Sequence, residues 1–293
     1  MNQYLINSKN GKINIIEGKN ITEPKAIILN IHGLGAHFQP IYNNLDEFVA
    51  KDSWFSNFNY MSVAFEFNGH GKSEGMRCMI NNFDDLLEDL DTVIKHFNEK
   101  FTDKKIFMCA ESMGGAVVIK YIIQKAYLNI NGVILLSPLC GIDEQLKPNK
   151  LVLNLLYYTS YLFPRLKLPL TTRKIYSKTS INQDYIKNRN LCSYSYKDSH
   201  RLGTVRELLN VSLWISNNIS NFNVPILLLH GLNDKITTPS GSIIVFNSII
   251  NKKKELVVLP NSEHNLLVNN NPDDLTPNFI YVKILNWIES HIV

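Results

Sequence analysis

The chain has 293 residues, of which 45% are apolar and 19% are charged, and its mean hydropathy is −0.09. This composition is typical of a globular protein and excludes a disordered or collagen-like chain. The formal net charge of +4 is too small and too dispersed to favour nucleic acid as a partner. Cys78, Cys109, Cys140 and Cys192 stand far apart, which indicates neither a zinc site nor a disulfide framework, so we expect reduced thiols and no bound metal.

The amino-terminal segment, MNQYLINSKNGK, is polar. It lacks the basic start and the apolar core of a signal peptide. No apolar run in the sequence reaches the roughly 18 residues that a membrane-spanning helix needs. We therefore expect a soluble, cytoplasmic protein.

Short apolar runs recur along the chain. Runs of this length without polar alternation are typical of parallel strands that are buried on both faces. The expected strands cover residues 26–31, 61–65, 106–109, 133–136, 226–229 and 256–259.

Helical patterns lie between these runs. Within 82–100, the residues Phe83, Leu86, Leu90 and Phe97 recur at helical spacing. Similar patterns cover 113–126 and 278–292. The alternation predicts an α/β fold with a mostly parallel central sheet flanked by helices.

One segment, residues 141–219, interrupts the alternation. It has helix-like apolar stretches separated by Pro148, Pro164 and Pro169, and it carries 12 basic and five acidic residues. We interpret it as a helical cap inserted into the core. The predicted organisation is a first part of the core at 1–140, the cap at 141–219 and the second part of the core at 220–293.

Ser112 lies at a tight turn between a predicted strand and a predicted helix. A nucleophile at such a turn needs small residues two positions before and after it, and these are Ala110 and Gly114. At the start of the helix, the N–H of Met113 would point at a developing oxyanion. The alternative is that Ser112 only caps the helix.

The first predicted strand ends in His32-Gly33-Leu34-Gly35. A glycine-containing turn after this strand supplies the second oxyanion N–H in α/β-hydrolases, and we assign it to Leu34. We expect His32 to be structural, packed under the turn.

Two further polar residues follow strands in the carboxyl-terminal part. Asp234 comes just after the strand at 226–229, and His264 lies on the loop after the strand at 256–259. Asp234 could instead form an Asx-turn, a role for which Asn233 competes. The order Ser112, Asp234, His264 is that of the catalytic triad of α/β-hydrolases, so we predict nucleophile, acid and general base, respectively.

These motifs give the chain a family resemblance. It resembles the monoacylglycerol lipase and lysophospholipase branch of the α/β-hydrolases, which has similar segments at 32–35, 65–75, 111–115, 136–138 and 201–209. Glu111 stands where the animal enzymes commonly have histidine, and in this the chain is similar to plant-type members.

The resemblance implies an α/β-hydrolase fold and a serine esterase. Its substrate would be a single-acyl lipid, either a monoacylglycerol or a lysophospholipid, and it would need no metal or organic cofactor. Two alternatives stay open: a broad-specificity small carboxylesterase or thioesterase, and a non-catalytic binding protein that keeps the fold.

The cap segment 151–163 would be apolar around nearly its whole circumference as a helix. Such a helix is either packed on the core, or it lines an acyl tunnel and makes peripheral contact with a membrane. On the second interpretation, Leu156 and Tyr157 contact substrate. Phe38, Gln39 and Tyr42 follow the oxyanion turn and would either line the alcohol side of the pocket or have a core or surface role. Basic residues of the cap would lie near lipid head groups: Arg165, Lys167, Arg173 and Lys174.

Overall fold

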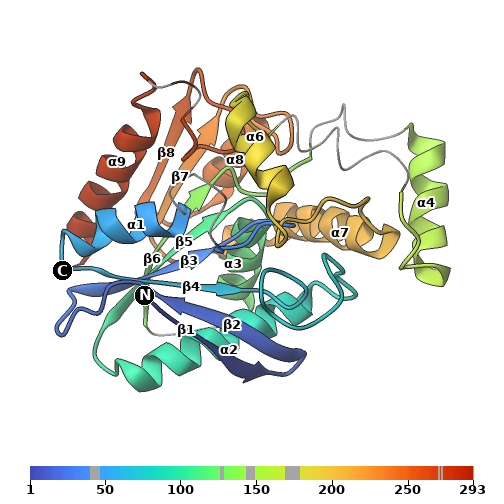
Figure 1. The fold of residues 1–293 in the computed structure, drawn as a ribbon. Helices are drawn as coiled ribbons and strands as arrows, with labels where there is room; N and C mark the ends of the chain where they lie inside the picture. The colour runs from blue at the N-terminus through green and yellow to red at the C-terminus, as the bar shows by residue number, and fades with distance from the viewer. Residues whose placement is uncertain are drawn as a thin grey trace.

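The computed structural model describes residues 1–39, 47–125, 129–142, 149–168, 179–269, 271 and 273–292. Its centre is an eight-stranded sheet with the order β1-β2-β4-β3-β5-β6-β7-β8 (Figure 1). Strands β3 to β8 run parallel, as their buried apolar runs predict, whereas β1 and β2 are antiparallel to their neighbours. The bounds are β1 Asn2–Ser8, β2 Gly11–Glu17, β3 Ala26–Ile31, β4 Met61–Glu66, β5 Lys105–Glu111, β6 Ile130–Leu136, β7 Ile226–Gly231 and β8 Lys254–Leu259.

The two edges of the sheet differ from the sequence prediction. The hairpin of β1 and β2 was not predicted, and it turns through Gly11 at a φ of +127°, where glycine is favoured. At the other edge, β8 is only partly buried, with Val258 36% exposed. The expectation that every strand is buried on both faces is therefore wrong for β8, because it has a neighbouring strand on one side alone.

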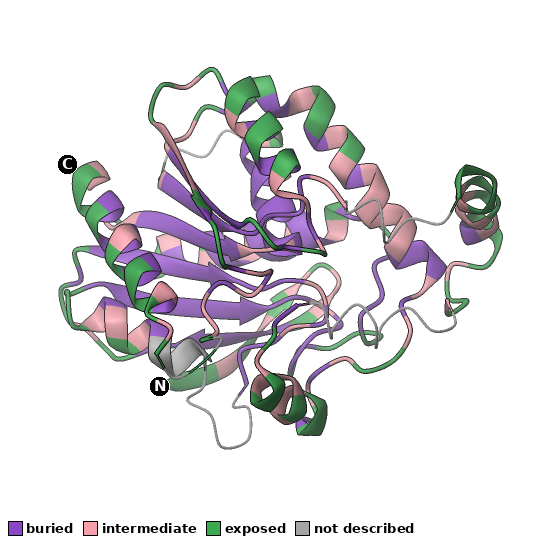
Figure 2. Cartoon of the chain, turned by 90° about the horizontal axis from the view of Figure 1, so that it is seen from above, coloured by how far each residue is buried: buried purple, intermediate pink, exposed green. Residues whose placement is uncertain are grey.

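Helices cover both faces of the sheet. Along β3, Ile27, Leu29 and Ile31 point to the hydrophobic cluster under α2, α3 and α7, whereas Ala26 and Ile28 join the cluster under α1 and α9. Figure 2 shows the buried strands between these two helical layers. The bounds are α1 Glu47–Ser56, α2 Asp84–Lys100, α3 Met113–Gln124, α4 Lys150–Leu162, α6 Gln183–Leu191, α7 Leu202–Asn218, η2 Ile219–Asn221, α8 Pro239–Ser248 and α9 Thr276–His291.

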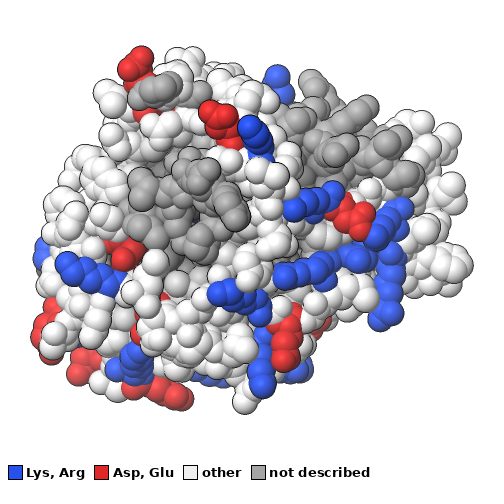
Figure 3. Space-filling model, in the orientation of Figure 1, with Lys and Arg blue, Asp and Glu red and all other residues white. Residues whose placement is uncertain are grey.

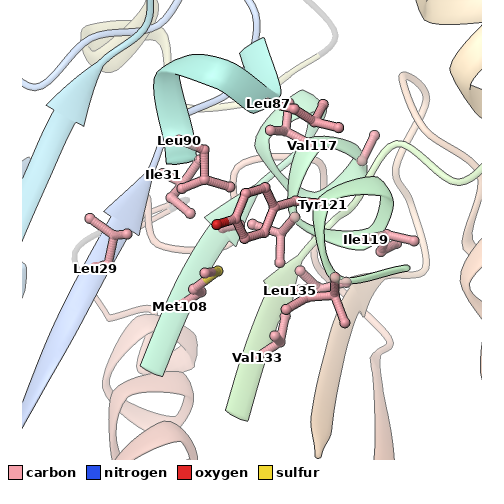
Figure 4. Close-up of a cluster of buried hydrophobic side chains, with 14 of the residues drawn as sticks. Leu29, Ile31, Leu87, Leu90, Met108, Val117, Ile119, Tyr121, Val133 and Leu135 are labelled. Carbon is pink, nitrogen blue, oxygen red and sulfur yellow. The ribbon is translucent and has the colours of Figure 1, made fainter. Parts of the chain in front are cut away.

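The cluster between α2, α3 and the sheet packs under the turn that carries Ser112, the predicted nucleophile. In Figure 4, Leu87 and Leu90 of α2 and Val117 and Tyr121 of α3 lie over the strands. The Tyr121 hydroxyl donates a hydrogen bond of 3.0 Å to Asp91, so its one polar atom is satisfied inside the core. Helix α3 is thereby fixed against the sheet along its length.

The connection from β6 to β7 contains α4, α6 and α7. Helix α4 lies away from the sheet and packs on α7 (Figures 1 and 2). Helix α7 in turn packs on α3, and its Val211 and Ile215 belong to the main hydrophobic core. The division of the chain at residue 219 therefore stays a prediction, since α7 is shared between the core and the predicted cap.

In the part of the chain that the structure describes, no helix is long and apolar enough to cross a membrane.

Candidate active site

Ser112 occupies a strained turn between β5 and α3. Its φ and ψ angles are 51° and −118°, a conformation that residues with a side chain rarely adopt. The turn is crowded: a Cβ atom on Gly114 would lie 2.7 Å from the carbonyl oxygen of His32, and one on Gly33 would lie 2.9 Å from Cβ of Ser112. Small residues are thus required where β3 meets the start of α3, which is the geometry of a nucleophile elbow.

The structure brings Ser112, Asp234 and His264 together at the carboxyl edge of the sheet. Oγ of Ser112 lies 3.0 Å from Nε2 of His264, and Nδ1 of His264 lies 2.7 Å from Oδ2 of Asp234. An ionised carboxylate can only accept, so Nδ1 carries the proton and Nε2 accepts from the serine hydroxyl. The three side chains therefore form one continuous hydrogen-bonded chain.

The carboxylate of Asp234 is nearly saturated with donors. Its Oδ1 accepts the N–H groups of Ile236 and Thr237 at 2.7 and 3.1 Å. Its Oδ2 accepts the Thr237 hydroxyl at 2.8 Å and Nε2 of His230 at 3.1 Å, in addition to His264. Burial alone would raise the pKa of Asp234, but the charge of His264 and the hydrogen bonds from His230 and His264 hold that pKa well below its usual value.

His230 and Thr237 were not predicted from the sequence as partners of Asp234. The available signal was a histidine at the end of an otherwise apolar strand, four residues before the predicted acid. A polar residue inside such a strand needs a partner, and a neighbouring carboxylate is one.

The predicted oxyanion residues lie beside the serine. Gly33, Leu34 and Met113 line the same cavity as Ser112. As the first residue of α3, Met113 has an N–H group without an acceptor inside the helix. Both backbone segments that were expected to supply oxyanion donors therefore border the nucleophile.

His32 has the structural position that the sequence predicted. It is 3% exposed, its Nδ1 donates to the carbonyl of Gly33 at 2.7 Å, and its Nε2 accepts from the N–H of Phe67 at 3.1 Å. Burial lowers the pKa of His32 to about 4. A neutral imidazole thus joins the turn after β3 to the end of β4.

Glu66 explains the motif at 65–75. This carboxylate is 0% exposed and accepts the N–H groups of Lys72 at 2.7 Å and of Phe38 at 3.0 Å. A Cβ atom on Gly71 would lie 1.9 Å from Cδ of Glu66. The loop after β4 can wrap Glu66 only because glycine stands there, and Glu66 then holds the loop after β3 that carries the oxyanion turn.

An ion pair that the sequence did not predict lies next to the serine. Lys51 of α1, with a side chain that is 1% exposed, contacts the carboxylate of Glu111. Glu111 also lines the cavity. A buried cation needs such a partner, so Glu111 holds Lys51 under the site.

The site opens into a cavity of about 540 Å³. This volume is within the range of sites that enclose a small-molecule ligand, about 300–1,000 Å³. Most of its lining is apolar, and the predicted contact residues Leu156 and Tyr157 are part of it. Polar atoms come from Glu111, Arg189 and Arg206 among others.

The predictions for the alcohol side of the pocket have a different outcome. Phe38 is 4% exposed, packs in a core cluster with Ile16 and Ala64, and does not line the cavity. This position supports the core role that the sequence left open for Phe38, and its N–H donates to Glu66. Tyr42 lies outside the described residues.

The surface around the insertion is basic. Lys and Arg side chains gather on the side of the molecule that carries α4 and α7 (Figure 3). Arg165 and Lys167, which follow α4, are both exposed. The basic residues Arg173 and Lys174 lie outside the described residues. Within the described ranges, no group of three or more His, Cys, Asp or Glu side chains could hold a metal ion.

A mostly parallel sheet with a serine at the strand-to-helix turn of a central strand defines the α/β-hydrolases, and the chain has this fold. Residues 22–271 match the model of the serine aminopeptidase S33 family of hydrolases. The chain belongs to this family.

Known relatives include proteins from plants, animals and fungi. The chain is 25% identical over 240 residues to the caffeoylshikimate esterase of Arabidopsis thaliana, covering 81% of this chain and 71% of that protein. It is 23% identical over 270 residues to the monoglyceride lipase of Rattus norvegicus, covering 92% and 84%. A soluble variant of Saccharomyces cerevisiae monoglyceride lipase, solved with a substrate analog, superimposes with a TM-score of 0.84 at 20% identity, covering 99% and 94%.

Proposed function

We propose that the protein is a serine esterase that cleaves single-acyl lipids, monoacylglycerol or lysophospholipid, through an acyl-enzyme. One observation carries this proposal: the hydrogen-bonded chain of Ser112, His264 and Asp234 borders an apolar cavity. Ser112 attacks the ester carbonyl while Nε2 of His264 takes its proton, and Asp234 stabilises the imidazolium through Nδ1.

The rest of the cycle uses the same groups. The N–H groups of Leu34 and Met113 hold the negative oxygen of the tetrahedral intermediate. His264 returns its proton to the leaving alcohol, and the acyl group stays on Ser112. Water then attacks the acyl-enzyme, with His264 again as the base, and releases the fatty acid. The proposed cycle needs no metal or organic cofactor.

The cavity supports a lipid acyl chain as substrate. Its walls include apolar side chains from the insertion, among them Leu156 of α4 and Leu202, Val205 and Leu209 of α7. An acyl chain gains free energy for each CH₂ that such walls remove from water. The monoglyceride lipase of Rattus norvegicus, matched over 92% of this chain, supports the same class of substrate.

The insertion at 141–219 is proposed to act as a cap over the site. Residues of α4, α6 and α7 line the cavity together with residues of the sheet edge. The excess of basic residues in this segment disfavours binding of a positively charged amino group, which argues against an aminopeptidase. The same positive charge is compatible with an anionic phospholipid as substrate.

The exposed face of α4 supports peripheral contact with a membrane. Leu151, Leu155, Tyr158 and Leu162 are 83, 67, 70 and 77% exposed, and their spacing forms one stripe along the helix. The stripe is too short to span a bilayer but can enter its interface, next to the exposed Arg165.

A second candidate is a small-ester hydrolase with broad specificity, a carboxylesterase or thioesterase. It is supported by the 25% identity to a caffeoylshikimate esterase and by the carboxylate of Glu111 in the cavity wall. A third reading, a non-catalytic binding protein, is disfavoured because the hydrogen-bonded chain from Ser112 to Asp234 is complete.

The test is turnover of a substrate panel by wild type and Ser112→Ala. The panel contains monoacylglycerols, lysophosphatidylcholine, short p-nitrophenyl esters and a short thioester. If the wild type turns over the long-chain lipids and the substitution abolishes this turnover, the proposed lipase function is supported. Turnover of short esters alone favours the second candidate. Equal activity in both proteins, or no fluorophosphonate labelling of Ser112, rejects the mechanism.

A further inference from the structure

A second histidine binds the carboxylate of the proposed triad. His230, at the end of β7, is 0% exposed, and its Nε2 lies 3.1 Å from Oδ2 of Asp234. This is the same oxygen that His264 uses. On the other side of the ring, Nδ1 of His230 lies 2.7 Å from Oγ of Ser242 in α8. The imidazole is thus held between a carboxylate and a hydroxyl group.

The carboxylate decides the role of one nitrogen of the ring. The carboxylate of Asp234 can only accept, so Nε2 of His230 carries a proton. The hydroxyl of Ser242 can donate to Nδ1 or accept from it, so it is a partner for that nitrogen in either case. The contact is therefore a hydrogen bond donated to Asp234, and both histidines donate to one oxygen.

We propose that His230 is a positioning residue of the reaction, which aims Oδ2 of Asp234 at His264 and limits how strongly that carboxylate stabilises protonated His264. This inference rests on the hydrolase function proposed above. A hydrogen bond to a carboxylate spreads its negative charge, so each added donor weakens the attraction of the carboxylate for a neighbouring cation. Loss of the donor would let His264 hold its proton up to a higher pH, where it cannot act as a base.

Among the residues that the structure describes, few other ionisable groups lie around His230. In the loops that follow β7 and β8, Lys235 and Glu263 lie close to Asp234, and burial raises the pKa of Glu263. Strand β6 and helix α8, which pack against β7, carry no ionisable side chain. The ionisable residues of β8, Lys254 and Glu255, pair with the opposite end of β7. Glu263 is thus the group whose titration must be separated from that of the triad.

Two substitutions separate the two nitrogens of the ring. His230→Gln places an amide N–H near the position of Nε2 and keeps a donor for Asp234. His230→Asn places its amide near Nδ1, so it keeps a partner for Ser242 and loses the donor to Asp234. Glu263→Gln is the control for the neighbouring carboxylate. The measurement is kcat/KM for a p-nitrophenyl ester between pH 4.5 and 9, normalised by fluorophosphonate labelling of Ser112.

We expect His230→Asn to lower kcat/KM about tenfold and to move the acid limb of the profile up by about 0.5 to 1 pH unit. His230→Gln should restore most of the rate and the position of the limb. The inference is overturned if both variants behave alike, or if Glu263→Gln moves the limb and His230→Asn does not. If the wild type neither turns over esters nor labels at Ser112, the proposed function fails first.

A second measurement needs no substitution. In ¹⁵N-histidine-labelled wild type, NMR reports which ring nitrogen of His230 carries the proton. The inference requires the Nε2–H form at neutral pH. A proton on Nδ1 would turn a lone pair toward Asp234 and would overturn the proposed donation, whatever the kinetics of the variants.

Discussion

Three buried histidines surround the turn that follows β3. The rings of His32 and His70 lie 5.0 Å apart, and His200 borders the cavity. Burial is the main cause that lowers the pKa of His32 and His200 to about 4 and that of His70 to about 3. All three rings are therefore neutral in the folded protein at neutral pH.

This arrangement predicts that the fold weakens in mild acid. An unfolded histidine has a pKa of about 6.5, so below that pH the unfolded chain binds protons that the folded chain does not. The stability that the neutral rings contribute is complete above about pH 6.5 and is lost as the pH falls toward 4. We expect each histidine to account for about 2 kcal/mol of lost unfolding free energy between pH 7 and pH 5, measured by guanidinium titration.

His70→Asn is the matched variant for this prediction. Nδ1 of His70 contacts the carbonyl of Asn68 at 3.2 Å, and the asparagine amide can donate to the same oxygen without titrating. The variant should lose less stability between pH 7 and pH 5 than the wild type does. Equal slopes for the two proteins would show that His70 takes up no proton on unfolding.

The residues of the candidate site divide into those that strand order can locate and those that it cannot. Ser112, Asp234 and His264 each follow an apolar run, so the sequence places them at one edge of a parallel sheet. The contact of Lys51 with Glu111 depends on packing between distant segments, and the contact of His230 with Asp234 depends on the turn that follows β7. Apolar periodicity carries no information about such pairs, and neither was predicted.

At the scale of elements, the parallel strands were predictable because both of their faces are buried. The hairpin of β1 and β2 was not predicted, because β1 alternates between exposed and partly buried residues instead of forming an apolar run. Its signals were that alternation and the Asn10-Gly11 pair at the end of the turn. Strand β8 has an apolar run, yet its place at the edge leaves it partly exposed.

Helix α4 combines two apolar faces. Leu153, Leu156 and Tyr157 line the cavity, while Leu155 and Leu162 lie on the exposed stripe. The two roles that the sequence suggested for an exposed helix, lining the cavity and contacting a membrane, would thus use different sides of it. A one-sided pattern would have indicated a simple surface helix.

The exposed stripe predicts binding to lipid vesicles. We expect the double variant Leu155→Ser, Leu162→Ser to bind phosphatidylcholine vesicles at least about tenfold more weakly than the wild type in a sedimentation assay. Each substitution removes apolar area that the membrane interface would bury. Turnover of a short soluble ester should stay the same. Ile250→Ser is the control, since Ile250 is 76% exposed and lies just before β8, away from the insertion. Equal weakening by both variants would contradict a specific role of the stripe.

For the molecule as a whole, the cavity joins the two parts of the chain. The sheet edge supplies Ser112 and His264, and the insertion supplies the apolar walls of α4 and α7. Neither part encloses the site alone. The chemistry thus belongs to the core, and we expect the insertion to set which acyl chains fit.

Acyl-chain preference should therefore respond to the face of α4 that is changed. Leu156→Trp adds bulk inside the cavity, and a filled cavity cannot accept an acyl chain without displacing its walls. We therefore expect kcat/KM for a sixteen-carbon ester to fall at least about tenfold relative to kcat/KM for a four-carbon ester. Leu155→Trp makes the same change one residue earlier, on the exposed stripe, and should leave this ratio unchanged when the esters are presented in detergent micelles. If Leu156→Trp does not alter this ratio, the acyl chain binds elsewhere. Turnover of the four-carbon ester shows, in the same protein, that the triad is intact.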